Sequence, residues 1–220
     1  MTAAVSIASF AVELLAWVVA PPRCAACDTP VRLLSVFCSA CASTAERVQD
    51  NDPPVTAAFV YGGAVERAIT RLKYDRRPDL ARPLGDLLWR ALRPDARGLR
   101  GSVVVPVPLH ASRLAQRGFN QAALIARRVA LRIDAPLLPL ALARVRDTPQ
   151  QAALDREGRI ANVAGAFCTR QSDRVRGRAV LLIDDVRTTG ATMNACASAL
   201  LVAGAASVAH AVVAVARAGV

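Results

Sequence analysis

Apolar and polar residues follow two different rhythms along this chain. Short runs of branched apolar residues have the length of buried strands, at residues 56–61, 103–107, 135–140, 179–183 and 207–215. Elsewhere apolar residues recur every three or four positions, as on one face of a helix, at residues 65–72, 80–88, 122–129 and 193–203. Because strands that alternate with helices build a mostly parallel sheet, the pattern predicts an α/β domain with a helix-flanked sheet.

The segment 179–204 carries the most specific pattern, because a strand is followed by an acidic pair, a turn and a helix. Asp184 and Asp185 end the predicted strand, where a parallel sheet binds its ligands. The turn leads into the amino-terminal end of the next helix, where free N–H groups and the helix dipole favour an anion. The turn residues are Thr188, Thr189, Gly190, Ala191 and Thr192. The segment predicts a site for a phosphorylated sugar, with phosphate on the turn and ribose hydroxyls on the carboxylates.

Two other interpretations of this segment are weaker. Asp and Thr cap helices in many α/β proteins, but a cap explains one acidic residue, whereas two adjacent carboxylates need a cation or a ligand to balance them. A nucleoside triphosphatase would pair the acidic residues with a loop ending in Gly-Lys-Ser/Thr. The single lysine, Lys73, lies between Leu72 and Tyr74, so that interpretation fails.

Four cysteines near the start of the chain form two CxxC pairs, at Cys24, Cys27, Cys38 and Cys41. Two tight turns with this spacing present four thiolates tetrahedrally to one Zn²⁺. Disulfides are the alternative, but nothing marks the chain as secreted, and such pairs bind metal in a reducing cytoplasm. Because four protein ligands leave no open position, we expect a structural zinc site in a cytoplasmic protein.

Residues 3–20 are apolar enough to suggest a signal peptide or a membrane span. No lysine or arginine precedes them, and Ser6, Ser9 and Glu13 form a polar stripe along a helix. We therefore expect an amphipathic helix that packs on the protein without stable membrane insertion, with membrane association as the minor alternative. Residues 50–54 have the composition of a linker, which divides the chain into a helix and zinc module at 1–50 and a larger α/β domain at 51–220.

The composition is that of a globular protein with a strong positive charge. Of the 220 residues, 54% are hydrophobic, which argues against a largely disordered chain. The net charge of +11 comes almost wholly from arginine and favours anionic partners such as phosphates or nucleic acid. Because arginine replaces lysine elsewhere, Lys73 is a candidate for a position that needs a compact ammonium group, with an ordinary surface lysine as an equal alternative.

Five segments are far more specific together than any one alone. They are the paired CxxC motifs at 24–41, LKYDRRPDLARPLGDLL from Leu72, VVVPVPLHASRLAQRGFNQ from Val103, DREGRIANVAGAF from Asp155 and LLIDDVRTTGAT from Leu181. Together they resemble the ComF-like family of type I phosphoribosyltransferases, nearly end to end. The resemblance implies the type I phosphoribosyltransferase fold, a mostly parallel twisted sheet flanked by helices, with an N-terminal zinc ribbon. One departure follows the Lys-Tyr pair, where the family commonly has a glycine and this chain has Asp75, Arg76 and Arg77.

The resemblance implies a Mg²⁺-dependent protein that binds phosphoribosyl pyrophosphate (PRPP) and transfers its 5-phosphoribosyl group to a nucleobase or amine. The transfer builds positive charge on the ribose and frees pyrophosphate, so basic side chains are needed near the leaving group. Arg113 and Arg117 follow the second predicted strand and are candidates to hold pyrophosphate with Lys73, although a solvated helix face is the alternative for each arginine. With Asp184 and Asp185 they form the expected catalytic set. No motif identifies the acceptor.

Two further functions stay open from the sequence. The family is linked to natural transformation, which implies a DNA-handling accessory protein whose zinc module and basic surface bind single-stranded DNA or a DNA-uptake helicase. The aromatic content of 4% argues against a surface on which bases stack. The other is a PRPP sensor without turnover, which needs the same ground-state contacts as the enzyme. An oligomer is compatible with each function.

Overall fold

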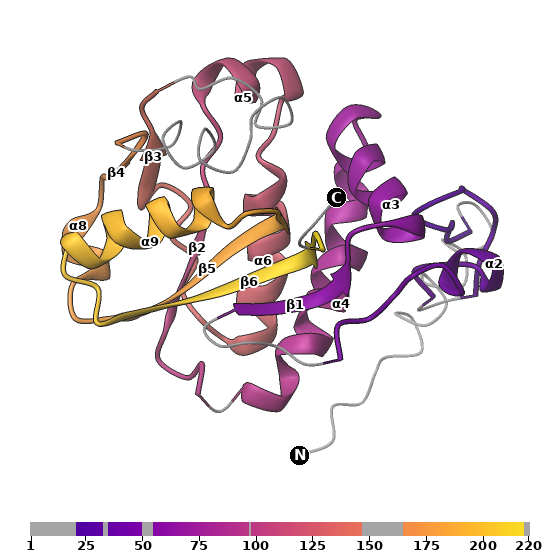
Figure 1. Cartoon of the computed structure of the whole chain (residues 1–220), viewed down its shortest axis with the longest axis horizontal. Coiled ribbons are helices and arrows are strands. Elements are labelled where there is room, and N and C mark those ends of the chain that lie inside the picture. Colours follow the sequence, from indigo (N-terminus) through magenta and orange to yellow (C-terminus); the bar gives the residue numbers. More distant parts are fainter. Residues whose placement is uncertain (1–20, 33–34, 50–54, 97, 147–164, 218–220) are drawn as a thin grey trace, which may run out of the picture.

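The computed structural model describes residues 21–32, 35–49, 55–96, 98–146 and 165–217. The helix expected near the N-terminus and the linker expected at 50–54 lie outside these residues. The described chain forms a central four-stranded sheet in the order β1-β6-β5-β2, in which all neighbouring strands are parallel (Figure 1). The predicted α/β architecture with a mostly parallel sheet is therefore confirmed.

The four strands lie where the apolar runs predicted them, with small shifts at their ends. They are β1 (Val55–Val60), β2 (Val103–Pro106), β5 (Ala179–Arg187) and β6 (Ser207–Val215). Strand β5 is longer than predicted, because its ladder with β6 continues past Ile183 to Arg187. Asp184 and Asp185 therefore belong to the strand itself, near its carboxyl end.

The prediction of a strand at residues 135–140 is wrong. In this stretch a single parallel bridge joins Leu137 to Val104. Pro136 and Pro139 lack the N–H group that a ladder needs, so pairing does not extend along the stretch. A short antiparallel pair follows, formed by β3 (Leu142–Arg144) and β4 (Phe167–Thr169).

Helices cover both faces of the sheet (Figure 1). One face carries α3 (Gly63–Tyr74), α4 (Ala81–Leu92) and α6 (Gln121–Ile133), and the other carries α9 (Ala191–Val202). The described chain also contains the short segments α2 (Ser39–Ala42), η1 (Pro78–Leu80), η2 (Arg93–Asp95), α5 (Ala111–Arg117) and α8 (Ser172–Val175). Within the described residues, no helix is both long and apolar enough to cross a membrane.

Alternating residues of β5 show how the core is divided between the two layers. Leu181 and Ile183 are buried with α3, α4 and α6, whereas Val180 and Leu182 are buried with α9. Since side chains alternate across a strand, a continuous apolar run serves both layers. Each buried Leu or Ile contributes about 2 kcal/mol. The apolar run ends at Ile183, so the acidic pair lies at the carboxyl end of β5, where the apolar core of both layers ends.

Asn120 fixes the start of α6 beside the end of β2. Its Oδ1 atom accepts hydrogen bonds from the N–H groups of Ala122 at 3.0 Å and Ala123 at 3.4 Å, which confirms the predicted cap. Its Nδ2 atom donates to the carbonyl of Val107 at 3.0 Å. The cap thereby holds the first residue of α6, Gln121, next to the loop that follows β2.

The described residues between 21 and 49 form a small module that packs against α3. Two turns and α2 bring the four cysteines together, with Cys24 and Cys41 buried. Ala64, in the first turn of α3, belongs to the same buried cluster as these two cysteines. Figure 1 shows this module beside α3, on the opposite side of the molecule from α9. The predicted domain boundary at residue 50 lies outside the described residues.

Candidate functional site

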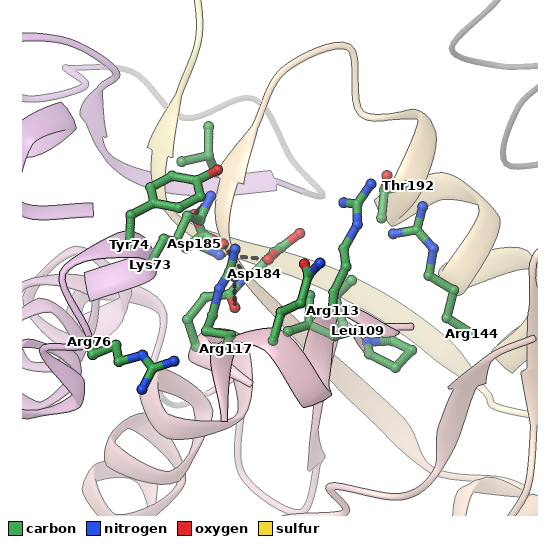
Figure 2. A pocket seen from close by; sticks show the side chains of 15 residues that line it. Lys73, Tyr74, Arg76, Leu109, Arg113, Arg117, Arg144, Asp184, Asp185 and Thr192 are labelled. Carbon is green, nitrogen blue, oxygen red and sulfur yellow. Dashed lines mark hydrogen bonds and ion pairs between the residues drawn. The ribbon is translucent and has the colours of Figure 1, made fainter. Parts of the chain in front are cut away.

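A cavity of about 530 Å³ opens at the carboxyl ends of β2 and β5, where parallel sheets bind ligands. Its lining comes from the end of α3, from the segment that follows β2 as far as α6, from β3, and from β5 and α9. The polar and charged lining residues are Lys73, Tyr74, Arg76, Arg113, Gln116, Arg117, Gln121, Arg144, Asp184, Asp185 and Thr192. In Figure 2 the acidic pair lies near Lys73, with Arg76 toward one end and Arg144 and Thr192 toward the other.

Asp185 is 2% exposed and holds the centre of a polar network. The Nζ atom of Lys73 lies 2.5 Å from its Oδ2 atom, and Gln121 Nε2 donates to its Oδ1 atom at 2.9 Å (Figure 2). Burial alone would raise the pKa of Asp185, but the Lys73 charge outweighs it and lowers that pKa. Burial also works against the charge of Lys73, yet Asp185 raises the pKa of Lys73. Both groups are therefore charged at neutral pH.

Asp184 is in the opposite electrostatic situation. Burial, together with the neighbouring charge of Asp185, raises its pKa well above the usual value of 3.8. Its Oδ1 atom accepts a hydrogen bond from the backbone N–H of Asp185 at 2.8 Å, and the residue lines the cavity. A cation or a hydroxyl donor at this carboxylate would favour its ionised form, so Asp184 gains from a ligand that supplies either one.

The turn between β5 and α9 requires a glycine. Gly190 adopts the left-handed conformation with φ 82°, and an added Cβ atom would lie 2.8 Å from Nε of Arg187. Oγ1 of Thr189 accepts a long hydrogen bond of 3.4 Å from the N–H of Ala191, at the start of the helix. Of the five predicted turn residues, Thr192 lines the cavity, and the other four form the bend and the first residue of α9.

Helix α5 carries both arginines predicted to hold pyrophosphate, and both line the cavity. Arg117 Nη1 donates to Oε1 of Gln121 at 2.5 Å, and its guanidinium carbon lies 5.5 Å from the centre of the Tyr74 ring. Gln121 in turn donates to Asp185, so Arg117 links the end of α3 to the acidic pair. The structure brings all five predicted catalytic residues to one cavity.

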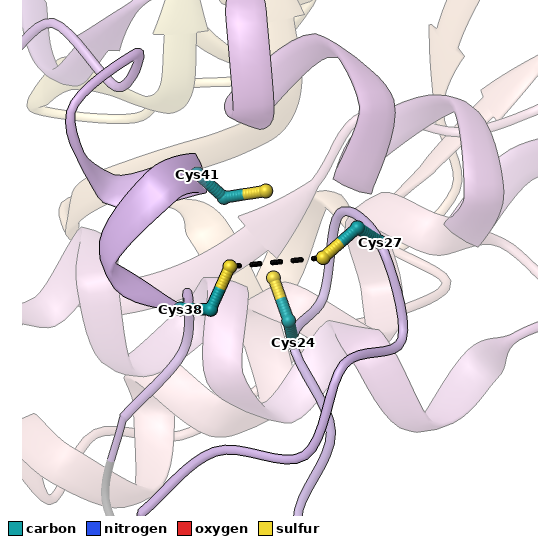
Figure 3. A group of neighbouring side chains, drawn as sticks. All are labelled: Cys24, Cys27, Cys38 and Cys41. Carbon is teal, nitrogen blue, oxygen red and sulfur yellow. Dashed lines mark hydrogen bonds between the residues drawn. The ribbon is translucent and has the colours of Figure 1, made fainter.

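The four cysteines form a separate candidate metal centre (Figure 3). Their Sγ atoms all lie within 4.8 Å of one another, and all four thiols are free. Four sulfurs placed tetrahedrally around Zn²⁺ at about 2.3 Å would lie about 3.8 Å apart. The Sγ atoms of Cys27 and Cys38 are 3.7 Å apart. The cluster can therefore bind zinc, in a site that leaves no position for substrate.

The environments of the cysteines differ when no metal is bound. Contact with Thr29 lowers the pKa of Cys27 to about 6, whereas burial raises the pKa of Cys41 to about 12. A divalent cation stabilises the thiolate form of its ligands, including a buried one. Metal binding would therefore release a proton from Cys41.

Comparisons with known proteins place the chain in a family. Residues 115–220 match the family model described as phosphoribosyl transferase domain. DNA utilization protein YhgH of Escherichia coli strain K12 is 32% identical over 199 residues, which cover 84% of this chain and 86% of that protein. This chain belongs to the ComF family. Competence protein F of Haemophilus influenzae is 29% identical, covering 79% of this chain and 76% of that protein. Competence protein ComFC of Bacillus subtilis is 32% identical over 99 residues, covering 45% of this chain and 38% of that protein.

Membership of the ComF family confirms the predicted resemblance and the type I phosphoribosyltransferase fold. The segment that matches the phosphoribosyl transferase domain contains β5, the turn and α9, and hence the acidic pair. Arg76 lies in the stretch where the resemblance leads us to expect a glycine, and its φ of 52° is left-handed. Side chains other than glycine adopt that conformation at a cost. Because Arg76 lines the cavity, the departure adds a positive charge there.

Sequence reasoning did not assign five polar or charged lining residues to the site: Tyr74, Arg76, Gln116, Gln121 and Arg144. Gln121 and Arg144 show why. Gln121 is 5% exposed although it is polar, and its position directly after the cap Asn120 was the one local signal. Arg144 lies on the three-residue strand β3 and stacks over the Phe167 ring of β4, with its guanidinium carbon 5.6 Å from the ring centre. A pair of such short strands leaves too little apolar alternation to be recognised.

Proposed function

We propose that this ComF-family protein binds PRPP with Mg²⁺ and transfers its 5-phosphoribosyl group to a nucleobase or amine, releasing pyrophosphate. The observation that carries the proposal is the position of Asp184 and Asp185, at the end of β5 and just before the turn that begins α9, in a cavity with basic walls. The phosphoribosyl transferase match over residues 115–220 supports it.

Three groups of residues would divide the substrate between them. The carboxylates of Asp184 and Asp185 accept hydrogen bonds from the ribose hydroxyls. The N–H groups of the turn at 188–192 bind the 5-phosphate at the positive end of α9. The basic side chains of Lys73, Arg113 and Arg117 bind the pyrophosphate. When bound, Mg²⁺ neutralises part of the pyrophosphate charge.

The charges of the cavity suit this reaction. Five basic residues line it against the two aspartates: Lys73, Arg76, Arg113, Arg117 and Arg144. As the bond from ribose C1 to pyrophosphate breaks, positive charge builds on the sugar beside the carboxylates and negative charge builds on the leaving group beside the cations. Fixed charges of both signs would thus stabilise the transition state more than the ground state, which is the requirement for catalysis.

Calorimetric titration of PRPP, with and without Mg²⁺, tests the binding step. We expect Mg²⁺-dependent binding that the double variant Asp184→Asn/Asp185→Asn weakens by at least about 100-fold, since each hydrogen bond to a charged group contributes about 1.5–3 kcal/mol. Zinc content and secondary structure of the variant serve as controls. The proposal would be wrong if the double variant bound PRPP with wild-type affinity, or if the wild type did not bind PRPP. Pyrophosphate release with candidate bases and amines then separates an enzyme from a PRPP sensor.

A second candidate function is DNA handling, through single-stranded DNA or a DNA-uptake helicase. It is favoured by exposed Arg174, Arg176 and Arg178, which gather at the start of β5, at the opposite end of the sheet from the cavity. Filter binding of single-stranded DNA at increasing salt tests this candidate, because phosphate contacts weaken steeply with salt. Retention that Arg174→Gln/Arg176→Gln lowers would support the candidate, and no retention at low salt would remove it.

We also propose that the cysteine module binds a structural Zn²⁺ and that the protein works in the cytoplasm. The clustering of the four cysteines supports a metal site, and a reducing compartment keeps such thiols available for metal. Measuring zinc in protein purified without added metal tests the site, and one equivalent is expected.

A further inference from the structure

The helix that carries Lys73 is attached to the cysteine module along its length. At its start, the N–H of Ala64 donates to Oγ1 of Thr44 at 3.1 Å. In its middle, Nη2 of Arg67 lies 3.7 Å from Sγ of Cys41. Near its end, Nη1 of Arg71 donates to the carbonyl oxygen of Ala25 at 3.2 Å. Figure 1 shows the module lying alongside α3. Contacts with the module therefore hold α3 in addition to its packing on the sheet.

The contact at the end of α3 is centred on one carboxylate, that of Asp28. Arg71 Nη2 donates to its Oδ2 atom at 2.6 Å, and Arg77 Nη1 lies 3.2 Å from its Oδ1 atom. The hydrogen bond from Arg71, with a further contribution from Arg77, lowers the pKa of Asp28. Arg77 also binds Asp79 through two hydrogen bonds of 2.8 and 2.9 Å. Asp28 is charged at neutral pH and joins both arginines to the module.

The turn formed by the first cysteine pair places the Asp28 carboxylate. Asp28 follows Cys27 directly and has a left-handed φ of 65°. Its N–H donates to the carbonyl of Cys24 at 2.9 Å, and the N–H of Cys24 donates to the carbonyl of Thr29 at 2.8 Å. A metal bound by Cys24 and Cys27 would hold the same turn closed. The conformation of the metal site therefore determines the position of the Asp28 carboxylate.

The two arginines held by Asp28 bracket a segment of the cavity wall. Lys73, Tyr74 and Arg76 lie between them in the chain, and all three line the cavity. We propose that Asp28 is a positioning residue that connects the cysteine module to the cavity, so that the module holds this segment in place for the pyrophosphate end of the ligand. The inference rests on the proposed binding of PRPP, and it adds a role for the module in ligand affinity.

Attachment of the module could instead serve stability alone, and a second carboxylate provides the matched control. Asp86 is held by Arg128 and Arg132 in the same two-arginine manner, at 2.9 and 2.8 Å, but it joins α4 to α6. None of these three residues lines the cavity. Removing the charge of Asp28 or of Asp86 breaks two arginine contacts in each case. Only the loss at Asp28 releases a segment that lines the cavity, residues 73–76.

The experiment compares Asp28→Asn and Arg77→Gln with the controls Asp86→Asn and Arg132→Gln in the full-length, zinc-loaded protein. Affinities for PRPP and for ribose 5-phosphate are measured with Mg²⁺, and amide hydrogen exchange is followed at residues 73–77. For Asp28→Asn and Arg77→Gln we expect about tenfold weaker PRPP binding, unchanged ribose 5-phosphate binding and faster exchange at 73–77. Both controls should match the wild type in all three measurements.

Zinc content is measured in every variant, and Arg77→Gln decides the matter if Asp28→Asn loses metal, because Arg77 lies outside the module. Wild-type exchange and PRPP affinity in that variant would overturn the inference. Equal weakening of PRPP and ribose 5-phosphate would overturn it too, since a general loss of structure has that effect. If the wild type binds neither ligand, the proposed function fails, and the exchange of residues 73–77 alone decides whether the module holds this segment.

Discussion

The two walls of the cavity are assembled in different ways. The acidic wall, residues 184–192, is one continuous stretch in which a strand, a turn and a helix start follow one another. The basic wall, made of Lys73, Arg76, Arg113 and Arg117 with the neutral Gln121, combines the end of α3 and the residues after it, helix α5 and the start of α6. Local geometry therefore sets the acidic wall, whereas the basic wall depends on how distant segments pack.

The walls also differ in how their charges are balanced. Asp185 has Lys73 at 2.5 Å and Gln121 at 2.9 Å, and its charge is satisfied before any ligand arrives. Asp184 has neither contact, and its pKa is raised by burial and by its neighbour. The ion pair between Lys73 and Asp185 joins the walls, and Asp184 is the group that a ligand would satisfy.

The largest effect is expected from breaking that junction with Lys73→Met. Asp185, with its side chain 3% exposed, would keep a buried charge without its cation, and loss of one partner of a buried pair costs about 3–5 kcal/mol. Urea unfolding at neutral pH measures the loss. Protonation of Asp185 removes the charge, so the loss should shrink as the pH falls. A companion change, Asp185→Asn in the same chain, should restore part of the stability, and a double variant no more stable than Lys73→Met would contradict the argument.

A smaller and opposite effect is expected from Asp184→Asn. The ionised carboxylate is disfavoured in the folded protein, so its removal should stabilise the ligand-free protein at neutral pH. PRPP binding should weaken at the same time, because the amide is a poorer acceptor for ribose hydroxyls. Thermal unfolding and calorimetry on the same sample measure the two opposite changes.

The pH dependence of Asp184→Asn follows from the direction of the pKa shift. Below 3.8 the carboxyl is protonated in both folded and unfolded chains, so the variant gains nothing there. As the pH rises above that value, the unfolded chain ionises first and the wild type loses relative stability. The advantage of the variant should therefore grow with pH until the raised folded-state pKa is passed. An advantage that is constant from acid to neutral pH would contradict the assigned shift.

The difference between the walls also explains what the sequence could predict. The acidic pair and its turn are adjacent in the chain, so the apolar run of β5 and the glycine at 190 were enough to place them. Lys73 was found because it is the single lysine. Gln121 and Arg144 could not be found that way, since a polar residue at a helix start or on a short strand becomes part of a site only through packing. The prediction of a strand at 135–140 was wrong because it rested on the apolar composition of this stretch, which also contains two prolines that block strand pairing.

The smallest change in stability is expected from Arg76→Gly, which tests the one departure in the basic wall. Glycine adopts the left-handed φ of 52° without strain, but it has more freedom to lose on folding, so the two terms should cancel to within about 0.5 kcal/mol. Arg76→Ala keeps the strain and removes the same charge. Both variants should bind PRPP severalfold more weakly if Arg76 contributes through its charge, with less difference from wild type at high salt because the side chain is exposed. Unchanged affinity in both would place Arg76 outside the ligand's reach, whereas weakening in the glycine variant alone would assign its effect to the backbone.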